Sequence, residues 1–156
     1  MDHVAYMKKS WGLLPKILSS EKVIESRWYQ SRYCPWGKIA AGDTVYFKNS
    51  GEFITVSAKV SQVLSFDNLT PAKVQEILGR YSRLDGIPSG KIFYYYNLFK
   101  DKKYCLLIFL TDVKKVAPFE INKSGFGAMS AWITVDNIDT IRESLPVVAE
   151  RLGDSL

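Results

Sequence analysis

Three charged side chains of different kinds lie close together near the amino terminus: Lys22, Glu25 and Arg27. Side chains alternate between the two faces of a strand, so Glu25 and Arg27 would share one face. Lys22 has the opposite parity, so it reaches the same site only if it belongs to the turn before the strand. We expect this, because residues 19–22 lie at the junction between a predicted helix and the strand. Lys22 and Arg27 could then hold a phosphate or a base oxygen, while Glu25 accepts a hydrogen bond from an exocyclic amine such as that of cytosine.

Two other uses of these residues remain open. In a hydrolytic site, a lysine with a lowered pKa activates water or attacks an amide carbon while a carboxylate moves protons, which would make Lys22 and Glu25 the catalytic residues. The sequence does not show whether the pKa of Lys22 is lowered, because burial and neighbouring charges decide it. In a structural site, Glu25 and Arg27 only tie the strand to a helix.

Aromatic and basic residues surround these three positions in the sequence. Nucleobases stack on aromatic rings, each stack being worth roughly 1–3 kcal/mol, although each ring can instead belong to the core. Trp36, between Pro35 and Gly37 in a polar loop, is the ring that a core position explains least well. The residues predicted to bind a ligand or RNA are Lys9, Ser10, Trp11, Lys22, Glu25, Arg27, Trp28, Arg32, Trp36 and Lys48.

Composition and charge favour a globular protein with an anionic partner. The chain has 156 residues and a formal net charge of +5. Residues 1–50 hold eight Lys/Arg against four acids, so +4 of this charge lies in the first third. Nucleic acid is the commonest partner of such a basic segment. An acidic protein partner and a merely solvated basic surface are the alternatives.

Several classes of function and location find little support. His3 is the single histidine and the two cysteines, Cys34 and Cys105, have no ligand spacing, so neither a metal, a cofactor nor a Ser-His-Asp site is expected. No apolar run approaches the ~20 residues of a membrane span, and residues 1–9 do not resemble a signal peptide. We therefore expect a cytoplasmic protein that does not enter a membrane. The sequence does not indicate its oligomeric state.

Strand-forming runs outnumber helical ones. A change in the apolar register near Gln62 predicts a bulge there. The predicted strands cover residues 3–7, 22–29, 43–48, 53–66, 104–111 with a continuation over 113–117, and 130–135.

Helical patterns lie between and outside these strands. The clearest covers 70–84, with Thr70 as the N-cap and Pro71 in the first position. Residues 91–99 are aromatic-rich and fit a helix or a strand. A shorter helix is predicted over 12–20, with Pro15 in its first turn. A last helix is predicted to begin at Asp136 and to be interrupted at Pro146, and its apolar face would hold Ile138, Ile141 and Leu145. Because regular βαβ alternation is absent, we predict an α+β fold: a small mixed β-barrel with about six strands and three or four peripheral helices.

The segment from Ser20 to Arg27 resembles the signature of the ASCH family, G-x-K-x-x-E-x-R. Lys22, Glu25 and Arg27 match it, and Ser20 stands where the signature has glycine. The run Gly42-Asp43-Thr44-Val45 is similar to the G-D-x-hydrophobic start of a strand in that family. The resemblance implies a barrel of the PUA-like class, forming a single ASCH-like domain over 1–156 with a helical elaboration around 68–100.

This resemblance also implies a function. PUA-like barrels are related to RNA-binding folds, so we expect a domain that binds RNA or a modified nucleobase in a basic, aromatic-lined cleft. Some ASCH proteins are amidohydrolases acting on acetylated cytidine, and nuclease activity occurs within the family, so an enzyme with Lys22 at its centre is the alternative. The amidohydrolases have threonine where this chain has Glu25, so only Lys22 carries over from them.

Overall fold

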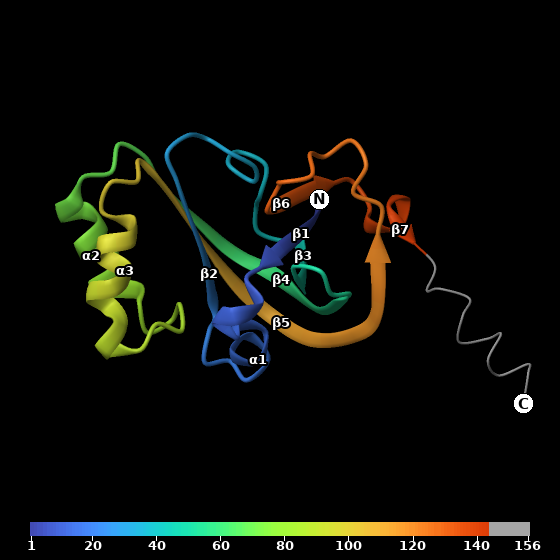
Figure 1. Ribbon diagram of the computed structural model, residues 1–156, viewed down its shortest axis with the longest axis horizontal. Helices are drawn as coiled ribbons and strands as arrows, with labels where there is room; N and C mark the ends of the chain where they lie inside the picture. Colours follow the sequence, from blue (N-terminus) through green and yellow to red (C-terminus); the bar gives the residue numbers. More distant parts are fainter. Residues whose placement is uncertain (144–156) are drawn as a thin grey trace, which may run out of the picture.

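The β-forming runs of the sequence build one curled, mixed sheet. The computed structural model describes residues 1–143, which contain seven strands (Figure 1). Their order is β2-β5-β4-β3-β1-β6, with β7 paired to the far end of β5. β1 and β3 run parallel and all other neighbours antiparallel. The strands are β1 (Asp2–Met7), β2 (Ile24–Tyr29), β3 (Thr44–Asn49), β4 (Ile54–Phe66), β5 (Tyr104–Ile121), β6 (Trp132–Val135) and β7 (Arg142–Glu143).

Two long strands give the sheet its curvature. β5 is continuous over 18 residues and arcs beneath the sheet (Figure 1), instead of forming the two predicted pieces. The β4–β5 register shifts at three places, one of them between Val60 and Gln62, which confirms the predicted bulge. A bulge leaves an extra residue on one strand and strengthens its bend. The result is a half-barrel whose end strands in the pairing order are β2 and β6.

Arg27 joins these two ends of the half-barrel. Its Nη2 donates to the carbonyl of Tyr6 at 3.3 Å and its Nη1 donates to that of Ala131 at 3.4 Å. The guanidinium also lies 5.0 Å from the centre of the Trp132 ring. No backbone ladder joins β2 to β6 within residues 1–143, so this side chain replaces one.

Three helices complete the fold: α1 (Leu13–Leu18), α2 (Pro71–Tyr81) and α3 (Ile92–Phe99). The backbone N–H of Lys73 donates to Thr70 Oγ1, which confirms the predicted cap of α2. The aromatic segment 91–99 is helical for most of its length. Figure 1 shows α2 and α3 together beside the β2 side of the sheet, with α1 at the near end of β2. No helix within 1–143 is both long and apolar enough to cross a membrane.

The predicted carboxyl-terminal helix is wrong in its described part. Asn137, and not Asp136, caps a single 3₁₀ turn over Ile138–Thr140, because its side chain accepts from the N–H of Asp139. Pairing with β5 then draws Arg142 and Glu143 into β7. Leu145 and Pro146 lie outside the described residues.

Candidate functional site

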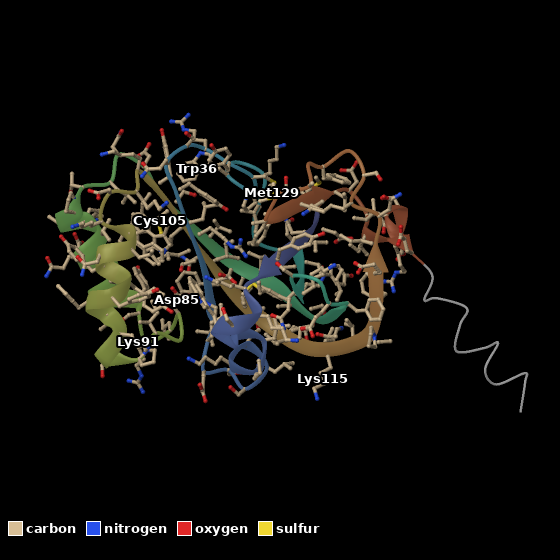
Figure 2. All side chains as sticks on the ribbon, in the orientation of Figure 1. Trp36, Asp85, Lys91, Cys105, Lys115 and Met129 are labelled. Atoms are coloured by element: carbon tan, nitrogen blue, oxygen red, sulfur yellow. The ribbon has the colours of Figure 1, made fainter. Side chains whose placement is uncertain are left out.

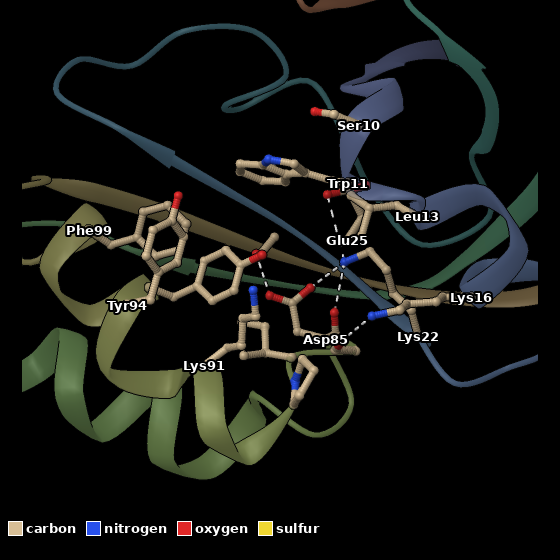
Figure 3. A pocket seen from close by; sticks show the side chains of 15 residues that line it. Ser10, Trp11, Leu13, Lys16, Lys22, Glu25, Asp85, Lys91, Tyr94 and Phe99 are labelled. Carbon is tan, nitrogen blue, oxygen red and sulfur yellow. Dashed lines mark hydrogen bonds and ion pairs between the residues drawn. The ribbon is translucent and has the colours of Figure 1, made fainter.

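A pocket of about 280 Å³ separates the sheet from the helical pair (Figure 3). The turn before α1 and α1 itself form one wall, through Trp11, Leu13 and Lys16. The start of β2 forms the floor, and the opposite wall comes from the loop after α2 and from α3. Segments far apart in the sequence therefore meet at the residues of the Lys-Glu-Arg motif.

Lys22 occupies the turn before β2, as its place at the helix–strand junction predicted. The preceding Ser20 has φ 66°, so it takes the left-handed conformation that the signature glycine adopts readily. The backbone N–H of Lys22 donates to the carbonyl of Lys16 at 3.0 Å, which closes the turn. Serine thus keeps the helix-to-strand geometry, and Lys22 Nζ lies 4.0 Å from Glu25 Oε1.

Asp85 is the main partner of Lys22, and the sequence interpretation missed it. Lys22 Nζ donates to the Asp85 carboxylate and, at 3.1 Å, to the Asp85 carbonyl. Ser26 Oγ donates to Asp85 Oδ2 at 2.6 Å. Lys22, Glu25 and Asp85 are all buried, and Figure 3 shows Lys22 Nζ between the two carboxylates. Read along the chain, Asp85 is only a turn residue before a glycine, and no sequence signal pairs it with Lys22.

Gly86 permits this close approach. Its φ is 76°, and a Cβ built there would lie 2.9 Å from Lys22 Cβ. Lys16 Nζ donates to the Gly86 carbonyl at 3.3 Å, and the N–H groups of Val23 and Ile24 donate to the Leu84 carbonyl. The loop after α2 is therefore fixed against the start of β2.

Glu25 lies between two cations. Its Oε1 is 4.0 Å from Lys22 Nζ and 3.8 Å from Arg27 Nε. With Asp85, these residues form what we call the charged cluster (Lys22, Glu25, Arg27 and Asp85), whose formal charge is zero. Glu25 Oε2 is buried and has no hydrogen-bond partner among residues 1–143.

Electrostatics keep Lys22 protonated. Burial alone would lower the pKa of its ammonium, but the charges of Glu25 and Asp85 and the hydrogen bond that Lys22 donates to Asp85 outweigh burial and raise that pKa. Burial also raises the pKa of the Asp85 carboxyl, against the opposing effects of Lys22 and Ser26. Lys22 is therefore a fixed cation, and not the amine with a lowered pKa that the hydrolytic alternative requires.

Rings from two elements line the pocket. Trp11 is 38% exposed, and its ring meets the Tyr95 ring edge-on at 5.9 Å. Tyr95 in turn meets Tyr94 edge-on at 5.1 Å. A second pocket of about 260 Å³ adjoins the first at Trp11 and Glu25, and Arg27 also borders it. Trp11 and Glu25 therefore face both hollows.

Six predicted binding residues do not line the first pocket, Lys9 and Arg27 among them, and contacts elsewhere hold the other four. Trp28 stacks on Phe99 at 4.7 Å and belongs to the core, although its edge borders the second pocket. Trp36 packs against the Tyr104 ring at 5.2 Å and against the barrel core, so a core role explains it after all. Figure 2 shows Trp36 near the top of the view, apart from Asp85 and Lys91 below it. Lys48 is buried in an ion pair with Glu120 at 2.7 Å, and Arg32 lies over the Tyr104 ring at 5.5 Å.

Among the remaining predicted residues, Ser10 lines the pocket, while Lys9 is exposed and pairs with Glu52 at 3.1 Å. Sequence reasoning missed the other residues of the walls, which come from α1, the loop after α2, and α3. They include Lys16, Asp85, Gly86, Lys91, Tyr94 and Tyr95.

His3 takes part in a network away from this pocket. Trp132 Nε1 donates to His3 Nδ1 at 3.0 Å, so the proton on Nε2 faces Asp43 Oδ2 at 2.8 Å. Thr134 Oγ1 lies 2.9 Å from Nδ1. The order Thr-His-Asp resembles a catalytic triad, but the His3 ring is fully buried and unreachable for a substrate. Within residues 1–143, no group of His, Cys, Asp or Glu is arranged to hold a metal ion.

These features define the class of the protein: an α+β half-barrel in which a Lys-Glu-Arg motif opens the second strand beside a helical pair. No family model and no curated protein matches the sequence. Solved structures do match it. The ASCH protein from Zymomonas mobilis has a TM-score of 0.63 at 15% identity, over 89% of this chain and 90% of that chain.

Two crystal structures of variants of that protein give similar values. One has a TM-score of 0.63 at 15% identity, covering 89% of this chain and 93% of that chain. The other has a TM-score of 0.62 at 16% identity, covering 99% of this chain and 95% of that chain. The chain described here has the fold of an ASCH domain, as the motif predicted.

Proposed function

We propose that this protein binds RNA by taking one unpaired nucleobase into the pocket beside Glu25. The observation that carries the proposal is Glu25 Oε2, a buried carboxylate oxygen without a hydrogen-bond partner among residues 1–143. Buried polar atoms are nearly always paired, so such an atom beside a pocket marks a place where a ligand donor fits. Trp11 and Tyr95 both line the pocket, so each offers a ring on which a nucleobase can stack.

The charged cluster indicates which bases fit. Glu25 lies 4.0 Å from Lys22 Nζ and 3.8 Å from Arg27 Nε, and a carboxylate in an ion pair offers acceptors only. Cytosine and adenine carry an exocyclic amine that donates, whereas the corresponding edge of uracil carries an oxygen. A site that offers an acceptor rejects a ligand that presents another acceptor, because both groups would be buried unpaired. We therefore expect a preference for amine-bearing bases over uracil.

Basic side chains at the pocket support an anionic ligand. Lys16 and Lys91 line its wall, and Lys8 Nζ lies 5.4 Å from the centre of the Trp11 ring. Because the charged cluster is neutral, these lysines give the mouth a positive potential that attracts phosphate. The cytoplasmic location expected from the sequence remains part of the proposal.

Hydrolysis of an acylated cytidine is the less favoured function. It requires a neutral amine or another strong base in the pocket, and the raised pKa of Lys22 opposes this. Binding to an acidic protein would use the same lysines but not the buried acceptor of Glu25. Neither alternative explains why an unpaired carboxylate oxygen borders the pocket.

The test is a titration with short single-stranded RNAs made of C, A or U alone. Wild type should bind C and A about tenfold more tightly than U. Glu25→Gln keeps the shape but replaces part of the acceptor with a donor, and it should remove that preference. Glu76→Gln, at an exposed position on α2, is the matched control and should keep it.

Equal affinities for C and U, in wild type and Glu25→Gln alike, would overturn the proposal. Incubation with acetylated cytidine, followed by chromatography of the products, tests the hydrolytic alternative. Turnover that Lys22→Met abolishes would replace binding with catalysis as the function.

A further inference from the structure

The outward side of α3 exposes large apolar side chains. Phe93 is 75% exposed, Tyr94 56% and Leu98 44%, and no residue of α3 is fully buried. The other side of the helix packs its half-buried rings, Tyr95 and Phe99 among them, against the core. We call Phe93, Tyr94, Asn97 and Leu98 the outer face of α3. Exposed aromatic residues gathered on one face mark an interaction surface more often than scattered ones do.

This face continues from the pocket. Tyr94 lines the pocket while more than half of its surface remains exposed, so it stands at the mouth. Its ring meets Tyr95, whose ring meets Trp11 inside. Figure 3 shows Tyr94 and Lys91 on the α3 side of the hollow, facing Trp11 across it. A chain of rings therefore leads from the motif to the outer face of α3.

The charges around this face are basic. α3 itself carries no charged residue, Lys91 precedes it, and Lys100, Lys102 and Lys103 follow it with Asp101 as the only acid in between. Lys100 is seven positions after Phe93, which places both on the same side of a helix. Aromatic rings flanked by cations are the combination that holds single-stranded nucleic acid, through base stacking and phosphate contacts.

The dimensions fit a short strand. A helix of 8 residues is about 12 Å long, and stacked nucleotides rise by about 3.4 Å each. The outer face of α3 therefore offers room for roughly three stacked bases beyond the pocket.

We propose that the ligand is a single strand of RNA and not a free nucleoside, with one base in the pocket and the following bases stacked on Tyr94 and Phe93. This inference rests on the proposed function and adds the path of the strand across α3. Lys91 and Lys100 contact the phosphates at the two ends of that path.

The experiment compares cytidine monophosphate with cytidine di- and tetranucleotides, using wild type, Phe93→Ala and Tyr33→Ala. Tyr33 is 62% exposed and lines neither of the two pockets that flank Trp11, so its variant is the matched control. Affinity of wild type should rise with length. Phe93→Ala should weaken tetranucleotide binding about tenfold and leave the monophosphate affinity unchanged, and Tyr33→Ala should change neither.

A tetranucleotide that binds no more tightly than the monophosphate would overturn the inference, as would a Phe93→Ala variant that binds it like wild type. If Glu25→Gln still abolishes the base preference in that case, the proposed function survives without the α3 path. Absence of RNA binding at every length overturns both. A dimer that Phe93→Ala dissociates in sedimentation, with no change in RNA affinity, would make the outer face of α3 a subunit contact and refute the inference.

Discussion

Replacing Asp85 with asparagine tests whether the helical pair holds the motif lysine in place. The substitution keeps the size of the side chain and an oxygen acceptor but removes one negative charge. Lys22 then remains buried as a cation with Glu25 4.0 Å away as its nearest carboxylate. The Ser26 hydroxyl, which donates to Asp85 Oδ2, also loses a charged acceptor.

The expected loss is large. Two unit charges 4.0 Å apart attract by about 4 kcal/mol at an effective dielectric constant of 20, and Asp85 approaches Lys22 more closely than Glu25 does. Breaking a buried ion pair by removing one partner typically costs about 3–5 kcal/mol, because the other charge stays buried. We expect Asp85→Asn to lower the free energy of unfolding by about 3 kcal/mol.

Urea denaturation of a double-mutant cycle measures this coupling. Lys22→Met and Asp85→Asn should each destabilise the protein, and the double variant should be more stable than the sum predicts by about 2 kcal/mol. In the double variant Glu25 keeps Arg27 as a partner at 3.8 Å, so no isolated charge remains. Additive losses, or a loss below about 1 kcal/mol for Asp85→Asn, would refute the buried pair.

Three further changes test other parts of the structure. Gly86→Ala should lower the free energy of unfolding, measured in urea, by about 3 kcal/mol, because it adds a contact of 2.9 Å with Lys22 to the strain of a positive φ. Gly51→Ala is the control: its new Cβ meets nothing within 4 Å, so it should lower that free energy by only about 1–2 kcal/mol. Equal losses would contradict the tight contact. Arg27→Lys should lower the free energy of unfolding by about 1–3 kcal/mol, because one ammonium cannot replace the two guanidinium hydrogen bonds that join the ends of the half-barrel. Unchanged stability would show that the half-barrel does not need these bonds. Burial lowers the pKa of His3 below 6.5, against the opposing effect of Asp43. The unfolded chain therefore binds a proton that the folded chain does not. The free energy of unfolding should fall as the pH drops below 6.5, by at most about 1.4 kcal/mol per pH unit. His3→Gln should flatten this slope below about pH 6.5. A slope that survives the substitution would assign the titration to another group.

Local chemistry in the sequence predicted several features correctly. Thr70 and Pro71 mark the start of α2 because a hydroxyl cap and a residue without an N–H both suit the first turn of any helix. The shifted apolar register near Gln62 marked the bulge in β4 for a similar reason, since side-chain direction follows the backbone locally. The carboxyl-terminal segment was misread because Ile138 and Ile141 fit a helical stripe, while pairing of Arg142 and Glu143 with β5 decided the outcome.

The residues of the candidate site also divide into those that local sequence predicts and those that only long-range contacts bring together. The sequence by itself determined the motif, the ASCH fold that it indicates, and the position of Lys22 in the turn before β2, because each depends on neighbours within a few residues. Only the tertiary structure decided that Asp85, 63 residues further along the chain, pairs with Lys22. It also decided that Lys48 pairs with Glu120 away from the cleft and that Trp36 packs on the core. The pKa of Lys22 follows from these partners, since burial and charge are set by what the folded chain brings within a few ångströms and not by the residue types themselves.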